Sequence, residues 1–144
     1  MPATFRPLSA IQIAIVSALR ADGALAPRGD PAAPAVPKVY DRVPDAAQPP
    51  YVTCGEDDML WDGWDEYQSA TIRGRAHVWS RQPGRMECKA ICEDVLTAMD
   101  AVLDITASGA RVVDRLADHI RILDDPDGVT KHGIVGVNYE TEAL

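Results

Sequence analysis

Residues 56–66 have the most unusual composition in this chain, with carboxylates that could bind a metal ion and tryptophans that could contact a protein partner. Six acidic residues and two tryptophans lie within these eleven positions. A calcium-binding loop needs carboxylates at its first, third and fifth positions, glycine at the sixth and glutamate at the twelfth. The acids and Gly63 do not match this spacing when the loop begins at Asp57 or Asp58. The spacing therefore argues against calcium.

Two interpretations of residues 56–66 remain open. Aromatic side chains on a loop are typical of protein interfaces, where they bury a large area inside a charged rim. Alternatively, the segment is a solvated hairpin tip whose tryptophans fold back onto a sheet. We favour the interface, with the contact residues Asp57, Asp58, Trp61, Asp62, Trp64 and Asp65.

A second candidate surface lies on the alternating segment 71–81. Its arginines share one face of the expected strand with His77 and an aromatic residue. Guanidinium groups in this pattern could bind phosphate or receive an acidic segment of a neighbouring chain, and a solvated sheet face is the alternative. Because this stripe and residues 56–66 have opposite charge, a head-to-tail ring would let them meet between subunits. The hypothesis therefore adds the interface residues Arg73, Arg75, Trp79 and Arg81.

Cys88 and Cys92 stand four residues apart in an expected helix, a spacing that could present two thiolates to one metal ion. Both lie at the centre of the apolar arc of that helix, where a free cysteine packs like a small hydrophobic residue. We therefore expect core packing and no metal site. With Cys54 the chain has three cysteines, an odd count that does not suggest a disulfide framework.

Sequence motifs for catalysis and cofactor binding are absent. There is no G-x-S-x-G nucleophile elbow, no phosphate-binding G-x-x-x-x-G-K-[ST] loop and no H-E-x-x-H zinc motif. Gly133 and Gly136 lie in a strand pattern rather than at a strand-to-helix turn, so they do not form a dinucleotide-binding fingerprint. We expect no catalytic residue, no cofactor and no enzymatic activity.

The composition fits a single domain spanning residues 1–144. A chain of this length with 47% apolar residues can build one hydrophobic core. The net charge of −8 argues against general nucleic-acid binding, which needs lysine and arginine to displace counterions. No apolar run approaches the roughly 20 residues of a membrane span, and the N-terminus is a poor signal peptide. We expect a soluble protein that assembles in the cytoplasm.

Hydrophobic periodicity predicts the elements that position these residues. Helices are expected at 7–22 and 84–103, short edge strands at 38–41 and 50–55, and longer strands at 71–81, 112–123 and 130–140. Prolines make 26–37 a long loop, and 125–128 is a strong turn. The order α-β-β-β-α-β-β predicts an α+β fold: a largely antiparallel sheet of about five strands with two helices packed on one face. A βαβ crossover between the third and fourth strands is possible.

The first helix is apolar over a wider arc than one core contact requires. Its core stripe recurs at three- and four-residue spacing and comprises Leu8, Ile11, Ile15 and Leu19. Ile13 and Val16 lie on a flank of this stripe. Either the helix is packed deeply in its own subunit, or this flank meets another subunit.

Three motifs carry a resemblance to a known family. They are Val39-Tyr40-Asp41-Arg42-Val43-Pro44 followed by Pro50-Tyr51-Val52, then His77-Val78-Trp79-Ser80-Arg81, then Asp125-Pro126-Asp127-Gly128-Val129-Thr130-Lys131-His132-Gly133. In this order and spacing the chain resembles the tail-completion or tail-terminator family of long-tailed phages and gene transfer agents, from the first helix to near Glu140. The proline-rich loop is longer than the family pattern.

The resemblance implies a structural virion protein without an active site. Such a subunit forms a homo-oligomer, a hexameric ring at the head-proximal end of the tail, that stops polymerisation of the tail tube. Its partners would be the tail-tube protein and the head–tail connector or adaptor protein, with DNA passing through unbound and no membrane. The protein would be located in the virion tail after assembly in the bacterial host cytoplasm.

Two alternatives from other classes remain. A soluble, non-enzymatic adaptor or effector domain would bind a single protein partner as a monomer or dimer, so its oligomeric state would distinguish it. A small hydrolase or metal-dependent enzyme would require a pocket into which several polar side chains converge.

Overall fold

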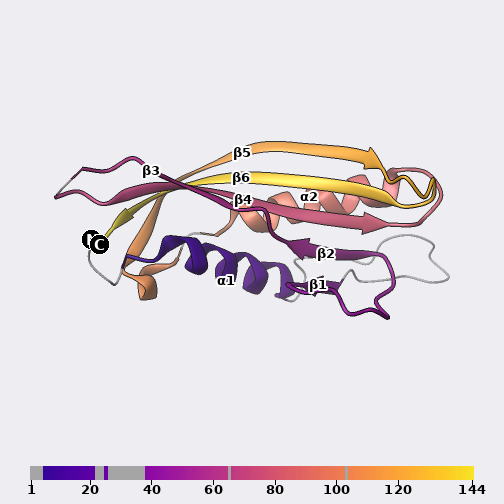
Figure 1. Ribbon diagram of the computed structural model, residues 1–144, viewed down its shortest axis with the longest axis horizontal. Helices are drawn as coiled ribbons and strands as arrows, with labels where there is room; N and C mark the ends of the chain where they lie inside the picture. Colours follow the sequence, from indigo (N-terminus) through magenta and orange to yellow (C-terminus); the bar gives the residue numbers. More distant parts are fainter. Residues whose placement is uncertain (1–4, 22–24, 26–37, 65, 103) are drawn as a thin grey trace.

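The computed structural model describes residues 5–21, 25, 38–64, 66–102 and 104–144. Two helices cover one face of a long, mostly antiparallel sheet, which confirms the predicted α+β class (Figure 1). The sheet has six strands, so the predicted count of five is one short. The expected proline-rich loop at 26–37 lies outside the described residues.

The elements follow in the order α-β-β-β-β-α-β-β, with one turn of 3₁₀ helix after the second α-helix. The helices are α1 (Pro7–Arg20), α2 (Met86–Asp100) and the 3₁₀ helix η1 (Thr106–Ser108). The strands are β1 (Lys38–Tyr40), β2 (Tyr51–Cys54), β3 (Asp58–Trp61), β4 (Ser69–Ser80), β5 (Ala110–Asp124) and β6 (Lys131–Ala143). β3 is the strand that the periodicity does not predict.

The centre of the sheet is formed by β4 and β6. The hydrogen-bonded order is β1-β2-β4-β6-β5, and β3 pairs with β4. Only the β1–β2 pair is parallel among the described strand pairs. Because β4 and β5 both run antiparallel to β6, the connection through α2 is a crossover with β6 inserted between its two strands. The prediction of two edge strands is right for β1 and wrong for β2, which lies between β1 and β4.

The helices bury their apolar stripes against the sheet. α1 buries Pro7, Ile11, Ile15 and Leu19, whereas Leu8 is exposed, so the predicted stripe is wrong at this position. At this end of the helix the buried residue is Pro7, and Leu8, one residue later, is rotated from it by about 100°. The predicted core face of α2 is confirmed, with Cys88, Ile91, Cys92, Val95, Met99 and the following Val102 buried. Full burial of a large aliphatic side chain stabilises by about 1.5–3 kcal/mol.

A close approach between α2 and β6 depends on Gly133. A Cβ atom at this position would lie 2.3 Å from Sγ of Cys92 and 3.1 Å from Sγ of Cys88. Both distances are shorter than normal van der Waals contacts, so a side chain fits there only if the cysteine side chains or the helix move. The predicted core role of the two cysteines is therefore confirmed, and their partner is the strand glycine.

The turn between β5 and β6 is built as the sequence predicts. Gly128 has a φ of 73°, a left-handed conformation that glycine adopts without strain. The Asp127 carboxylate accepts hydrogen bonds from the backbone N–H groups of Val129 and Thr130, both at 2.8 Å, and from the Thr130 hydroxyl at 2.6 Å. These bonds favour the ionised form and lower the pKa of Asp127 to about 2.

The contact at Gly133 gives a prediction with an internal control. Gly133→Ala should lower the free energy of unfolding by about 1–3 kcal/mol, because the new methyl group overlaps with the Cys92 sulfur. Combining it with Cys92→Ala should cost less than the sum of the two single changes, since the smaller residue makes room. Chemical denaturation of the four proteins measures the coupling. Strict additivity would show that the sulfur is not what excludes a side chain here.

Candidate assembly surfaces

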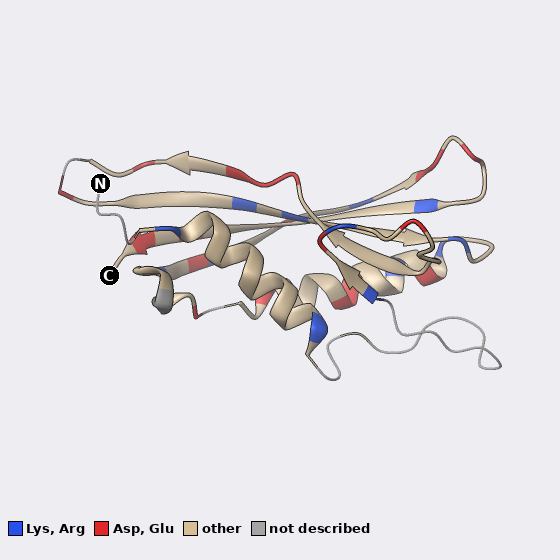
Figure 2. Cartoon of the chain, turned by 60° about the horizontal axis from the view of Figure 1, so that its bottom comes forward, with Lys and Arg blue, Asp and Glu red and all other residues tan. Residues whose placement is uncertain are grey.

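The segment with the most unusual composition forms a hairpin that extends one end of the sheet. We call residues 56–68 the acidic arm; they comprise β3 and the turn that leads into β4. Figure 1 shows the arm reaching beyond both helices, and Figure 2 shows acidic residues along it. The arm contains no lysine or arginine. Asp65, one of the predicted contact residues, lies outside the described part of the chain.

The tip of the arm is held by hydrogen bonds and by one glycine. Trp64 and Tyr67 exchange two backbone hydrogen bonds of 2.9 and 2.8 Å. Asp62 accepts hydrogen bonds from the hydroxyls of Ser69 and Thr71, the latter at 3.1 Å. A Cβ atom on Gly63 would lie 2.1 Å from the Tyr67 carbonyl oxygen, so only glycine permits this turn. Asp62 therefore shapes the arm itself, in addition to its predicted place on an interface.

The two tryptophans of the arm differ in how much of their surface the subunit covers. Trp61 is 54% exposed and packs against the buried Phe5 ring, with ring centroids 5.7 Å apart. Trp64 is 71% exposed and packs only on Tyr67, at 4.9 Å, among the described aromatic pairs. The tryptophans thus fold back only in part, and Trp64 keeps most of its apolar surface in solvent.

The acids at the start of the arm meet the arginines of β4 inside the same subunit. Asp58 pairs with Arg73 in the strand register and lies 3.9 Å from its guanidinium group. Asp57 accepts a 3.1 Å hydrogen bond from the backbone N–H of Arg75, and burial raises the pKa of this carboxyl group. The opposite charges that the sequence places on the arm and on β4 therefore interact within one subunit at these positions. Pairing between subunits stays a prediction.

The basic stripe, defined as Arg73, Arg75 and Arg81, lies along β4 and just beyond its end. Arg75 donates to the Gly74 carbonyl at 2.9 Å and to Asp118 of β5 at 3.3 Å. Arg81 donates from Nε to the Thr130 hydroxyl at 3.2 Å. Arg75 thus connects β4 to β5, and Arg81 connects the end of β4 to the residue before β6. Part of the hydrogen-bonding capacity of these arginines is therefore used within the subunit.

Trp79, also predicted as a contact residue, belongs to a stack of rings on β4 and β6. Its ring lies parallel to that of His132, with centroids 3.9 Å apart. Nδ1 of His77 and Nε2 of His132 are 2.7 Å apart, so one ring donates a hydrogen bond and the other accepts it. Burial, and then the neighbouring His77, lower the pKa of His132. The stack connects the two central strands through side chains.

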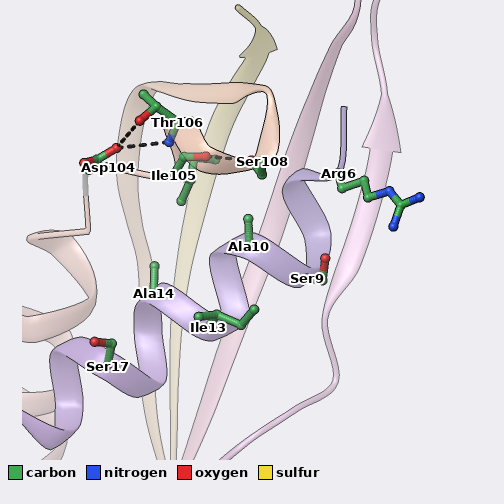
Figure 3. A pocket seen from close by; sticks show the side chains of 10 residues that line it. All are labelled: Arg6, Ser9, Ala10, Ile13, Ala14, Ser17, Asp104, Ile105, Thr106 and Ser108. Carbon is green, nitrogen blue, oxygen red and sulfur yellow. Dashed lines mark hydrogen bonds between the residues drawn. The ribbon is translucent and has the colours of Figure 1, made fainter. Parts of the chain in front are cut away.

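Two further surfaces, the outer flank of α1 and the edge strand β5, expose apolar side chains. Of these two, the sequence suggests only the flank of α1 as a contact surface. Ile13 of α1 is 70% exposed, so the interpretation of a deeply packed helix is wrong for this residue. Beside it lies a hollow of about 490 Å³ between α1 and η1 (Figure 3). The edge strand β5 exposes Val113, Leu116, Ile120 and Leu123. The spacing of these residues does not follow the two-residue alternation of a single strand face, and one of the two β-bulges of β5 lies between Leu116 and Ile120.

Cysteine, histidine and acidic side chains are the groups that could bind a metal ion or act as nucleophiles. Across residues 5–21, 25, 38–64, 66–102 and 104–144, no three histidine, cysteine or acidic residues gather as metal ligands would. A hydrogen bond to Cys88, together with burial, raises the pKa of Cys92. Burial and the nearby Asp57 raise the pKa of Cys54 to about 11. Both thiols are therefore protonated and poor nucleophiles at neutral pH.

No described helix is long and apolar enough to cross a membrane.

Comparison with known proteins identifies the class to which this fold belongs. A model of the family described as "Tail completion protein gp17" matches residues 13–142. A chain in the structure titled "Virion of native gene transfer agent (GTA) particle" shares the fold, with a TM-score of 0.69 and 19% identity. The alignment covers 94% of this chain and 96% of that one. No curated protein matches the sequence.

The class is that of structural proteins of phage tails. The chain belongs to the tail completion protein gp17 family, which confirms the resemblance seen in its motifs. This is a family of structural virion proteins rather than a class of enzymes.

The ring stack predicts a change in stability at mildly acidic pH. The pKa of His132 lies below its ordinary value of 6.5, so the unfolded chain takes up a proton more readily than the folded chain. The stability that the neutral His132 ring contributes is thus fully present above pH 6.5 and is lost as the pH falls from there toward the pKa of the folded state. Between about pH 7.5 and about pH 5.5, the melting temperature should fall less in His132→Gln than in the original protein.

The two proteins are compared by how much their melting temperatures change with pH. Their absolute melting temperatures differ at every pH, because His132→Gln also removes ring stacking. Asp127, whose pKa is about 2, does not titrate in this window. Equal falls in the two proteins would exclude His132 as the origin of the acid sensitivity.

Proposed function

We propose that this protein forms a ring at the head-proximal end of a phage-type tail, where it stops polymerisation of the tail tube and joins the tail to the head connector. The observation that carries the proposal is the match of the tail completion family over residues 13–142. The fold shared with a chain of a gene transfer agent particle supports a place in a virion. Assembly would take place in the host cytoplasm.

The distribution of apolar surface supports self-assembly. Exposed apolar side chains occur on the acidic arm, on the outer flank of α1 and along β5. Exposed apolar side chains that cluster on the surface of a soluble protein often mark a binding site. Different patches on one subunit can be joined by a head-to-tail contact, which closes into a ring when the rotation between subunits is suitable. A hexamer is the ring size that the family resemblance implies.

The charge of the subunit is suited to a channel for DNA. The chain has a net charge of −8, and a ring multiplies this charge around its axis. A surface of the same sign as phosphate repels the DNA backbone and lets it slide without specific binding. The arginines of the basic stripe are engaged by protein groups at Asp58, Asp118 and Thr130. Contacts with the tail-tube protein and the connector would use the two faces of the ring.

An adaptor that binds one protein partner is the competing function. In an adaptor, the exposed arm would also be a contact surface, and the fold would be the same as in a ring-forming protein. The two functions differ in oligomeric state, because an adaptor would remain a monomer or dimer at all accessible concentrations.

The ring hypothesis is tested by light scattering and negative-stain imaging of the purified chain, with variants of the arm. The double variant Trp61→Ala, Trp64→Ala should fold, as judged by circular dichroism, but fail to form rings, because aromatic anchors dominate interface energetics. The double variant Asp57→Asn, Asp58→Asn should affect assembly less and in a salt-dependent way. A wild-type protein that stays monomeric or dimeric would contradict the proposal.

A further inference from the structure

The tip of the acidic arm projects beyond the strand pairs of the sheet. The chain enters the tip after Trp61, where β3 ends, and returns to the sheet at Ser69, where β4 begins. Figure 1 shows this part of the hairpin extending beyond both helices. The hydrogen bonds between Trp64 and Tyr67 fix the turn, but they lie within the tip and do not set its direction. A two-stranded hairpin without further support is only marginally stable in water.

One carboxylate connects the tip to β6 and to the edge strand β5. Glu142, near the end of β6, accepts a hydrogen bond from the Tyr67 hydroxyl with Oε2. Its other oxygen, Oε1, accepts from the guanidinium group of Arg111, with a distance of 2.6 Å to Nε. Arg111 and Glu142 are directly paired in the register of β5 and β6. We call Tyr67, Glu142 and Arg111 the Glu142 latch.

The Glu142 latch is formed by groups in the protonation states that they have at neutral pH. The bond from Tyr67, together with the bonds from Arg111, favours the ionised carboxylate and lowers the pKa of Glu142. The same bond to Glu142 holds the hydroxyl proton and raises the pKa of Tyr67. The Glu142 side chain is only 12% exposed, although that of Arg111 is 60% exposed. The carboxylate is therefore covered by its own partners.

The other contacts of the arm lie at its base or within the hairpin. Trp61 packs on Phe5 before the tip begins. Asp62 bonds to hydroxyl groups of β4, which is the second strand of the same hairpin. The backbone N–H of Ala143 donates to the Gln68 carbonyl at 2.8 Å, where the chain returns to the sheet. The Glu142 latch differs from these contacts because it joins a side chain of the turn to two other strands.

We propose that the Glu142 latch is a positioning device, which holds the tip in line with the sheet and so presents Trp64 in one orientation. Tyr67 makes this connection, because its ring packs on Trp64 with centroids 4.9 Å apart while its hydroxyl reaches Glu142. A contact residue that is already ordered loses less conformational freedom on binding, which increases affinity. The consequence for ring assembly rests on the proposed function, whereas the positioning of Trp64 is a property of the single subunit.

Nuclear magnetic resonance relaxation of the tryptophan indole N–H groups tests the positioning. Tyr67→Phe removes the hydroxyl and keeps the ring that packs on Trp64. In this variant the order parameter of the Trp64 indole should fall from about 0.85 toward about 0.6. The Trp79 indole, which donates to the Thr53 hydroxyl at 3.4 Å, should keep its value and is the internal control. An unchanged order parameter at Trp64 would overturn the inference.

A matched pair of charge variants separates the latch from a general effect of lost surface charge. Glu142→Gln removes the charge of the latch. Asp124→Asn removes the charge of the pair between Arg85 and Asp124, which is 2.6 Å long and lies at the opposite end of β5. Only Glu142→Gln should lower the order of Trp64. An equal loss of order in Asp124→Asn would contradict a specific role of Glu142.

A double variant tests whether the hydroxyl acts through the carboxylate. In a protein that already carries Glu142→Ala, the further change Tyr67→Phe should have little additional effect on the order of Trp64, because the bond is absent in both cases. Additive losses would show that the Tyr67 hydroxyl is held by another group. That result would also overturn the inference.

Ring assembly provides a separate measurement of the consequence. Tyr67→Phe should raise the concentration needed for half-assembly by about threefold, because the tip must then be ordered on binding. If Trp64 loses order while rings form at the normal concentration, the latch is confirmed and the arm is not a ring contact. If the wild-type protein forms no ring, the proposed function fails, and the order parameter of Trp64 still decides whether the latch exists.

Discussion

The packing of α2 against β6 is the contact on which the rest of the subunit depends. Near the start of the helix, the sulfur atoms of Cys88 and Cys92 occupy the space that Gly133 leaves open. Near its end, the buried hydroxyl of Tyr139 donates a 2.6 Å hydrogen bond to the Met99 carbonyl. Two fixed points along one helix determine both its distance from the strand and its direction. The interior is close-packed, so neighbouring elements must adapt to this arrangement.

The remaining elements follow from that arrangement. A Cβ atom on Gly74 of β4 would lie 3.1 Å from the Tyr139 ring and 3.2 Å from Ile15, so α1 packs where β4 and β6 are already joined. Two helices of this length cannot cover strands of 12 to 15 residues together with the arm. The arm and most of β5 therefore remain outside the core. Surface that one subunit cannot bury becomes available for contact with other subunits.

Regular patterns could be predicted from the sequence, and interrupted ones could not. The apolar face of α2, the alternation of β4 and the turn at Gly128 each follow from one local rule, and all three are present. β3 has only four residues, and its pairing depends on the tight turn at Gly63, whose need for glycine appears only in three dimensions. The candidate contact residues could be named as exposed, charged or aromatic. Their partners inside the subunit, such as Asp118 for Arg75, join segments 43 residues apart that no local pattern connects.

The long edge of the sheet carries features that oppose strand pairing with other chains. β5 is a 15-residue edge strand with exposed apolar side chains, an arrangement that invites pairing with any other edge. Two β-bulges interrupt it, between Val112 and Asp114 and between Ala117 and His119, and charged residues recur along its length. Bulges and charges of this kind prevent an uninterrupted ladder between chains. A ladder would also tolerate shifts of register and growth into open fibres. The proposed ring of defined size would therefore depend on contacts between side chains rather than on pairing of β5 with another edge.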